Sequence, residues 1–258
     1  MKKILLAISP SKAFGGGQKV FLTTISELLK KKYEVVVVLP DESLLDNFKT
    51  LDVTIYLVNF NSISCINSIR KILRKEKVDI INTYLPRCSF AFSFVNLFFR
   101  VPICCTLLNA AKHQKLNILQ SSVYPMLYFL LFKISDGFIV NSEENKKHFI
   151  KVAKINEDFI KVIYSGIDMD EFSNNPYQKE KTNSFFVGMV GRLSKEKGPS
   201  YLVEALSFMK GIDFKCLIVG DGPLKNELED QVKKNICKKD VSSWDFRITL
   251  LNSCRRWM

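Results

Sequence analysis

The sequence has few of the residues that hold metals or form disulfides. Its 258 residues include two histidines, His113 and His148, and neither stands at a spacing typical of metal ligands. The seven cysteines include no Cys-x-x-Cys pair, and only Cys104 and Cys105 are close together. These features argue against a disulfide framework and against a structural zinc site. We therefore expect a reducing, cytoplasmic compartment, and no metal or other cofactor held by the protein.

Long apolar runs are also absent. The two most apolar stretches, Phe90 to Phe99 and Val123 to Ile134, are shorter than the roughly 20 residues that a membrane-spanning helix needs. We interpret them as helices of a large core, with a surface that rests on a membrane as the alternative. The run Ile4 to Ile8 is too short for a signal peptide and predicts a first buried strand.

Acidic residues are outnumbered by basic ones. The chain has 38 Lys and Arg against 26 Asp and Glu, which gives a net charge of +12. Such a charge suits nucleic acid, an anionic membrane face or phosphorylated small molecules. The basic residues are spread along the chain without the interleaved aromatic residues that single-strand binders use. We therefore expect no nucleic-acid partner.

Short apolar segments alternate with helical patterns along most of the chain. Strands are expected at Ile4–Ile8, Val35–Leu39, Thr54–Val58, Asp79–Asn82, Ile103–Leu107, Phe138–Val140 and Val162–Tyr164. Helices are expected near Gln18–Lys31, Ile63–Lys75, Cys88–Phe99, Ser122–Ile134 and Glu143–Val152. Because the strands are continuously apolar, helices should cover both faces of the sheet. The pattern predicts an α/β fold with a parallel, doubly wound sheet.

A polar segment at Ser173–Asn183 is typical of a linker. The alternating pattern restarts after it. Two more strands are expected at Phe185–Val190 and Phe214–Val219, each followed by a helix. We therefore expect two domains, residues 1–172 and residues 184–258, joined by a linker at 173–183, with the second domain short.

A triple glycine follows the first predicted strand. In parallel sheets, ligands bind at the carboxyl ends of the strands, where helix N-termini present free N–H groups to anions. Gly15, Gly16 and Gly17 would let the backbone approach such a ligand. A plain flexible turn explains three glycines equally well.

Two loops of the second domain also follow directly after a predicted strand. Arg192 and Lys197 follow the first strand there, and a guanidinium with a nearby ammonium suits a diphosphate. Solvated loop charges are the alternative. Gly220 and Gly222 follow the next strand, where they would allow a nucleotide to lie close to the backbone.

The order of five segments resembles the retaining nucleotide-sugar glycosyltransferases of family 4. These segments are GGGQKV, DGFIVNSEENKK, KVIYSGIDMDEF, VGMVGRLSKEKGPSYLVEAL and LIVGDGPLKNELE, and the last two together are highly specific. The resemblance covers most of residues 1–241. It implies two Rossmann-like domains of GT-B type, an acceptor-side domain followed by a donor-binding domain. The implied activity is transfer of a sugar from a nucleotide-diphosphate sugar to a glycan or lipid-linked acceptor in surface polysaccharide synthesis. The basic charge and the apolar helix near Val123 suit an acceptor at a membrane face, so we expect a peripheral membrane contact.

The resemblance also implies roles for individual positions. Arg192 and Lys197 match the pair that holds the donor diphosphate, and the loop Gly15–Gly17 matches one that contacts donor phosphate or acceptor. Fixed cations stabilise the charge that builds on a leaving diphosphate, so no metal is required. Leu108 stands where the family commonly has a histidine, which puts one acceptor-side or sugar-contacting role in doubt. No catalytic residue is assigned.

The end of the sequence departs from the family pattern. A family segment with paired glutamates, which binds the donor sugar and ribose, has no counterpart here. The tail from about residue 242 reads SSWDFRITLLNSCRRWM, and a shifted reading frame would restore the family pattern. We expect a frameshift near Ser242 and an incomplete, inactive donor domain, with a genuine short variant or a split gene as the alternative. The alternative function is a non-catalytic remnant that binds a glycan or a partner.

Overall fold

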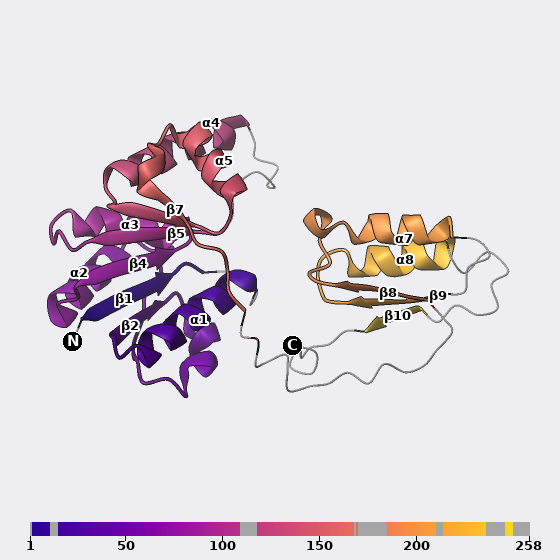
Figure 1. The fold of residues 1–258 in the computed structure, drawn as a ribbon, viewed down its shortest axis with the longest axis horizontal. Coiled ribbons are helices and arrows are strands. Elements are labelled where there is room, and N and C mark those ends of the chain that lie inside the picture. The colour runs from indigo at the N-terminus through magenta and orange to yellow at the C-terminus, as the bar shows by residue number, and fades with distance from the viewer. Residues whose placement is uncertain are drawn as a thin grey trace. The chain divides into compact units, whose positions relative to one another are not determined.

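The chain forms two compact units, each with its own parallel sheet. The computed structural model describes residues 2–10, 15–108, 118–167, 169, 185–209, 214–235 and 246–249. The first unit is Met1–Gly166 and the second is Ile167–Met258 (Figure 1). The linker predicted at 173–183 lies outside the described residues.

The first unit holds a seven-stranded sheet in the order β3-β2-β1-β4-β5-β6-β7, and all neighbouring strands are parallel. In its register, Leu5 of β1 lies between Val36 of β2 and Ile81 of β4. The strands are β1 Lys3–Ile8, β2 Glu34–Leu39, β3 Thr54–Leu57, β4 Ile80–Tyr84, β5 Ile103–Leu107, β6 Gly137–Val140 and β7 Ile160–Val162. The predicted parallel α/β fold is confirmed.

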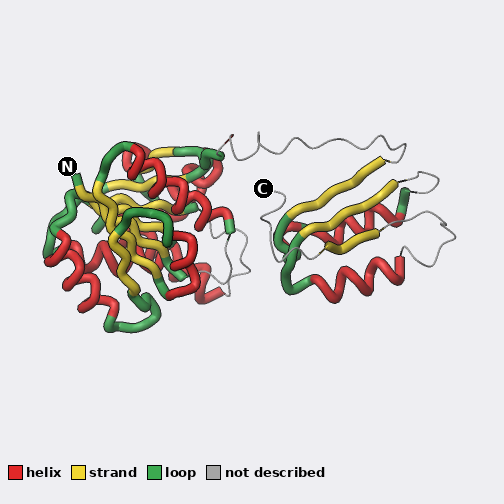
Figure 2. The backbone as a smooth tube through the Cα atoms, turned by 90° about the horizontal axis from the view of Figure 1, so that it is seen from below, coloured by secondary structure: helices red, strands yellow, loops and turns green. Residues whose placement is uncertain are grey.

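Helices cover the two faces of this sheet unequally. On one face lie α1 Gly16–Lys30 and the short 3-10 helix η1 Glu42–Phe48, and they pack on β1 and β2. The opposite face carries α2 Cys65–Glu76, α3 Pro86–Asn96, α4 Ile118–Lys133 and α5 Glu143–Ala153 (Figures 1 and 2). A 3-10 turn, η3 Glu157–Phe159, precedes β7.

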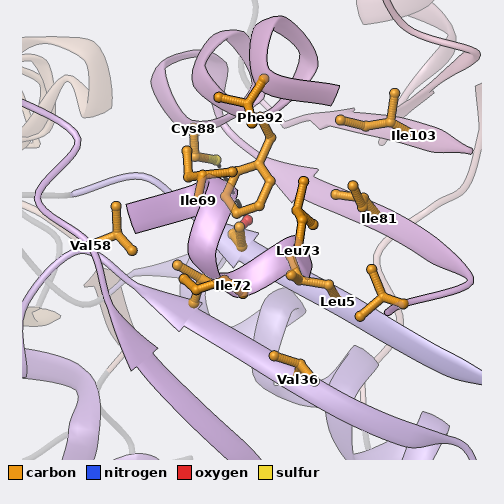
Figure 3. Packing of buried hydrophobic residues seen from close by; sticks show 14 of the residues in the cluster. Leu5, Val36, Val58, Ile69, Ile72, Leu73, Ile81, Cys88, Phe92 and Ile103 are labelled. Carbon is orange, nitrogen blue, oxygen red and sulfur yellow. Dashed lines mark hydrogen bonds between the residues drawn. The ribbon is translucent and has the colours of Figure 1, made fainter. Parts of the chain in front are cut away.

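The core of the first unit explains why its central strands are continuously apolar. Leu6 and Ile8 point to one face and pack with Phe21 of α1, whereas Leu5 points to the other face. There Leu5 belongs to a cluster with Ile69 of α2, Phe92 of α3 and other residues of β2, β4 and β5 (Figure 3). Because successive side chains alternate between faces, a strand with helices on both faces needs an apolar residue at every position.

The second unit has a smaller sheet in the order β10-β9-β8, formed by β8 Phe185–Val190, β9 Phe214–Val219 and β10 Phe246–Thr249. Its helices, α7 Pro199–Ser207 and α8 Lys225–Asn235, pack together on one face through the cluster Leu193, Val203, Leu206, Phe214, Cys216, Ile218, Leu224, Leu228 and Val232. On the other face, Val190 is 75% exposed within the part of the chain that the structure describes.

Several elements differ from the sequence expectations. The strand β10 lies in the tail that we expected to be aberrant, and its Phe246 is in register with Cys216 of β9. The strand β7 begins two residues earlier than predicted, because Ile160 is in register with Phe138 of β6. The helix η1 was not predicted, and the Asp41 side chain caps it by accepting the Ser43 backbone N–H at 2.9 Å. Within the described ranges, no helix is long and apolar enough to cross a membrane.

Candidate functional site

The predicted glycine loop lies at the carboxyl end of β1, where it leads into α1. Gly15 is the residue before the helix, and its backbone N–H donates to the side-chain oxygen of the buried Gln18 at 3.0 Å. Gly16 has open space where a Cβ would be, and no acidic side chain lies in the first turn. The first N–H groups of a helix lack intrahelical partners and carry partial positive charge. This end of α1 can therefore receive an anion.

Leu108 forms an apolar wall beside the glycine loop. It follows β5, is 7% exposed, and belongs to the core cluster under α1. A Cβ on Gly17 would lie 3.4 Å from the Leu108 Cδ1 atom. The Leu108 carbonyl accepts a hydrogen bond from the Asn145 side chain at 3.3 Å. The position where the family commonly has a histidine is thus occupied by Leu108, whose side chain cannot donate or accept a proton.

The turn after β4 carries a strained residue that the sequence did not reveal. Leu85 has a φ of 73°, which residues other than glycine rarely adopt. Hydrogen bonds hold it in place: its N–H donates to the Thr106 carbonyl at 3.1 Å, and its carbonyl accepts from the Ser89 hydroxyl at 2.9 Å and from the Ser9 hydroxyl at 3.4 Å. Two residues later, the exposed Arg87 donates to the Asn61 side chain. A cation that we did not predict therefore lies at this carboxyl edge, and the only sequence signal near it is the helix-starting Pro86.

In the second unit, the loops after β8 and β9 continue the parallel ladder beyond the strands. The Gly191 N–H donates to the Val219 carbonyl at 2.9 Å, and the Leu193 N–H donates to the Asp221 carbonyl at 2.9 Å. The Leu224 N–H then donates to the Leu193 carbonyl at 3.0 Å. The backbone on both sides of Arg192 is therefore held in place by the neighbouring loop.

This ladder explains Gly220 and Gly222. A Cβ on Gly220 would lie 1.8 Å from the Gly191 carbonyl oxygen, and a Cβ on Gly222 would lie 2.4 Å from the Leu193 carbonyl oxygen. Real Cβ atoms do not approach backbone so closely, so only glycine fits at either position. Close packing of the two loops accounts for both glycines, and their predicted contact with a nucleotide stays a prediction.

Arg192 and Lys197 lie at the two ends of the loop that follows β8, and both side chains are exposed. Lys197 belongs to the 3-10 turn η4 Lys195–Lys197, which ends at Gly198 with a φ of 68°. The salt bridges between described residues involve neither cation. The pKa of the Glu196 carboxyl between them is lowered, mainly by its own backbone N–H, next by the Ser194 side chain, and in smaller part by the charges of Arg192 and Lys197. The loop thus offers two cations to an anion.

The described residues include no group of three or more His, Cys, Asp and Glu side chains that could hold a metal ion. The described cysteines are free thiols: Cys65, Cys88, Cys104, Cys105 and Cys216. Burial raises the pKa of the Cys88 thiol to about 12. His113 lies outside the described residues, and His148 is on α5.

Solved structures share the fold of this chain at low sequence identity. A glycosyltransferase from Rickettsia africae gives a TM-score of 0.74 at 20% identity, over 95% of this chain and 68% of that one. HepE from Anabaena, solved with UDP and glucose, gives a TM-score of 0.72 at 19% identity, over 95% and 69%. The predicted class is therefore confirmed as an α/β protein with the GT-B glycosyltransferase fold.

The sequence itself identifies the family. Residues 14–171 match the family model described as Glycosyltransferase Family 4, and residues 170–244 match the one described as Glycosyl transferases group 1. The chain belongs to glycosyltransferase family 4, as the resemblance predicted.

Curated relatives include enzymes of lipid-linked glycan synthesis. The UDP-Gal:alpha-D-GlcNAc-diphosphoundecaprenol alpha-1,3-galactosyltransferase of Escherichia coli is 31% identical over 63% of this chain and 45% of its own length. The capsular polysaccharide biosynthesis glycosyltransferase CapM of Staphylococcus aureus is 25% identical over 62% and 45%. The chain thus spans about half the length of the curated relatives that it matches.

Proposed function

We propose that this chain supplies the acceptor-side domain and part of the donor-binding domain of a retaining glycosyltransferase. The transferred sugar comes from a nucleotide-diphosphate sugar, and the acceptor is lipid-linked or a glycan in surface polysaccharide synthesis. Family membership supports this proposal, together with relatives whose names specify diphosphoundecaprenol-linked acceptors. No further cofactor is proposed.

The observation that carries the proposal is the pair of exposed cations beside the ladder of the second unit. Arg192 presents a planar guanidinium that suits two phosphate oxygens, and Lys197 adds a mobile ammonium. As the bond between sugar and diphosphate breaks, negative charge grows on the diphosphate. Positive groups fixed in advance stabilise that charge without reorganising during the reaction.

The glycine loop of the first unit has the complementary role in this proposal. Its backbone N–H groups at the start of α1 receive a phosphate of the donor or the acceptor, beside the apolar Leu108. The chain is proposed to act in the cytoplasm, in peripheral contact with the inner face of the membrane where a lipid-linked acceptor lies. The alternative is a remnant that binds glycan or a partner without turnover.

Nucleotide binding tests the proposed diphosphate site directly. We would titrate the chain with UDP and with GDP by calorimetry, and repeat the titrations with Arg192→Ala and Lys197→Ala. Each substitution should weaken binding by about tenfold to a hundredfold, because hydrogen bonds to charged groups are worth about 1.5 to 3 kcal/mol. Lys195→Ala is the matched control, since it removes an exposed cation from the same loop.

Equal weakening by all three substitutions would mean that only the general positive charge of the loop matters. Nucleotide binding without release of nucleoside diphosphate, from sugar donors and acceptor-loaded vesicles, would favour the non-catalytic alternative. Absence of any nucleotide binding would contradict the proposed function.

A further inference from the structure

The strand β8 lies at an open edge of the sheet in the second unit. In the order β10-β9-β8, the described strands give β8 a partner on one side, which is β9. A strand at the edge of a sheet leaves a row of backbone N–H and C=O groups unpaired, and this row is a template for another strand. Native proteins usually protect such an edge with a charge, a proline or a very short strand.

The sequence of β8 has none of these protections. The strand is the six-residue run FFVGMV, which contains no charged residue and no proline. The other edge strands of the two described sheets are shorter, because β3 and β10 have four residues each and β7 has three. Two of them also carry a cation, Lys161 in β7 and Arg247 in β10. An uncharged edge of the length of β8 therefore calls for a partner strand.

The hydrogen bonds to β9 show which backbone groups of β8 are free. The Gly191 N–H, just after β8, donates to the Val219 carbonyl of β9 at 2.9 Å. Successive residues of a strand direct their backbone groups to opposite sides, so every second residue before Gly191 faces β9. The backbones of Phe186, Gly188 and Val190 therefore face the open edge.

The sheet face beside this edge is also open. Val187 and Met189 pack with the cluster beneath α7 and α8, which both lie on one face of the sheet (Figure 1). On the other face, Val190 is 75% exposed and Leu217 of β9 is 37% exposed. A Cβ on Gly188 would have no atom within 4 Å. Another strand can therefore approach the middle of β8 from this side.

We propose that β8 pairs with β8 of a second copy of this chain, antiparallel across a two-fold axis at Gly188. The three residues that face the open edge are evenly spaced about Gly188, so each copy presents the same groups to the other. Gly188 pairs with Gly188 of the second copy, and Phe186 pairs with Val190. Each such pair exchanges two hydrogen bonds, which gives about six bonds and joins the two sheets into one.

A second copy suits this edge better than a different protein. The second copy brings the same open edge, so one contact covers both edges and leaves no β8 edge for further growth. Like charges do not oppose the pairing, because β8 has no charged residue. The two Arg192 side chains, four residues from the axis, would lie beyond opposite ends of the pair. Their backbones would be about 27 Å apart, which exceeds the screening length at physiological salt.

Sedimentation velocity of the whole chain tests the pairing. The parent should sediment as a dimer, with twice the 29.7 kDa of one chain. Gly188→Lys places like charges directly opposite each other across the axis, so it should raise the dissociation constant about tenfold, and less at high salt. The matched control is Leu217→Lys, which introduces the same charge on the same open face but on β9, away from the edge. This control should leave the dimer intact.

A second pair of variants tests the backbone hydrogen bonds. Gly188→Pro removes the N–H at the middle of the open edge and no bond to β9, because this N–H faces outward. Loss of the two central bonds should raise the dissociation constant about 30-fold. Gly188→Ala keeps the N–H and should keep the dimer. Circular dichroism of each variant should match that of the parent, because both positions are exposed on the sheet.

The outcomes are distinct. A parent chain that stays monomeric at micromolar concentration would overturn the proposal. Equal dissociation by Gly188→Lys and Leu217→Lys would also overturn it, because the open sheet face would then hold the copies together. Growth beyond a dimer would contradict the two-fold pairing. Dissociation by Gly188→Lys and Gly188→Pro, with both controls dimeric, would support the pairing even if the UDP and GDP titrations failed, because the proposal does not rest on nucleotide binding.

Discussion

Substitution of Gly220 should loosen the second unit and leave the first unit unchanged. A Cβ at this position would lie 1.8 Å from the Gly191 carbonyl oxygen and 2.9 Å from the Gly191 carbonyl carbon. No side-chain rotation can relieve this clash, because a Cβ is fixed to the backbone. The loops after β8 and β9 would have to separate, and the hydrogen bond from the Gly191 N–H to the Val219 carbonyl would be lost.

The size of the effect follows from two contributions. Loss of one hydrogen bond costs about 1 kcal/mol, and forced displacement of packed backbone costs about 1 to 3 kcal/mol, so Gly220→Ala should cost about 3 kcal/mol. Amide hydrogen exchange reports this free energy locally, and protection of β9 amides should fall about 100-fold. Gly188→Ala is the control, because Gly188 lies in β8 with no atom within 4 Å of the position of its Cβ.

Peptides from the first unit serve as the internal standard in the same mass-spectrometry experiment. If β9 exchanges equally fast in Gly220→Ala and Gly188→Ala, close packing of the two loops is not the reason for the glycine. Unchanged exchange with weaker UDP binding would instead favour the sequence-based interpretation, in which Gly220 makes room for a nucleotide.

Two further predictions concern titratable groups. The pKa of Glu76 is lowered below its ordinary 4.5, mainly by a hydrogen bond from the Tyr56 hydroxyl. The ionised Glu76 carboxylate therefore stabilises the fold above pH 4.5, and this contribution is lost as the pH falls through the lowered pKa. Glu76→Gln should therefore be destabilising in denaturant titrations near neutral pH and progressively less so under acid, whereas a pH-independent difference would contradict this cause. Burial raises the pKa of the Cys88 thiol to about 12. Iodoacetamide at about pH 8 should therefore label Cys88 at least about 100-fold more slowly in the native chain than in denaturant. Equal labelling rates would show that the core around Cys88 opens freely.

Sequence patterns were sufficient for the parts of the fold that depend on local periodicity. The continuous apolar runs of β1 and β2 predicted both strands and their burial on two faces, and the loop with Arg192 and Lys197 was predicted to follow β8. The conformation of Leu85 was not predictable, because its backbone donates to the distant Thr106 carbonyl and accepts from the distant Ser9 hydroxyl. The strand β10 was missed because its residues lie in the tail that we expected to be aberrant.

The hydrogen bonds that continue the ladder beyond β8 and β9 order the loop with Arg192 and Lys197, which its sequence alone does not show. Gly191 and Leu193 are each bonded to the neighbouring loop, so the residue between them is presented from a backbone that is already ordered. A site that is ordered before binding loses less conformational entropy when the ligand arrives. In the proposed function, the glycines after β9 therefore act by shaping the backbone that carries Arg192, without any need to touch the diphosphate themselves.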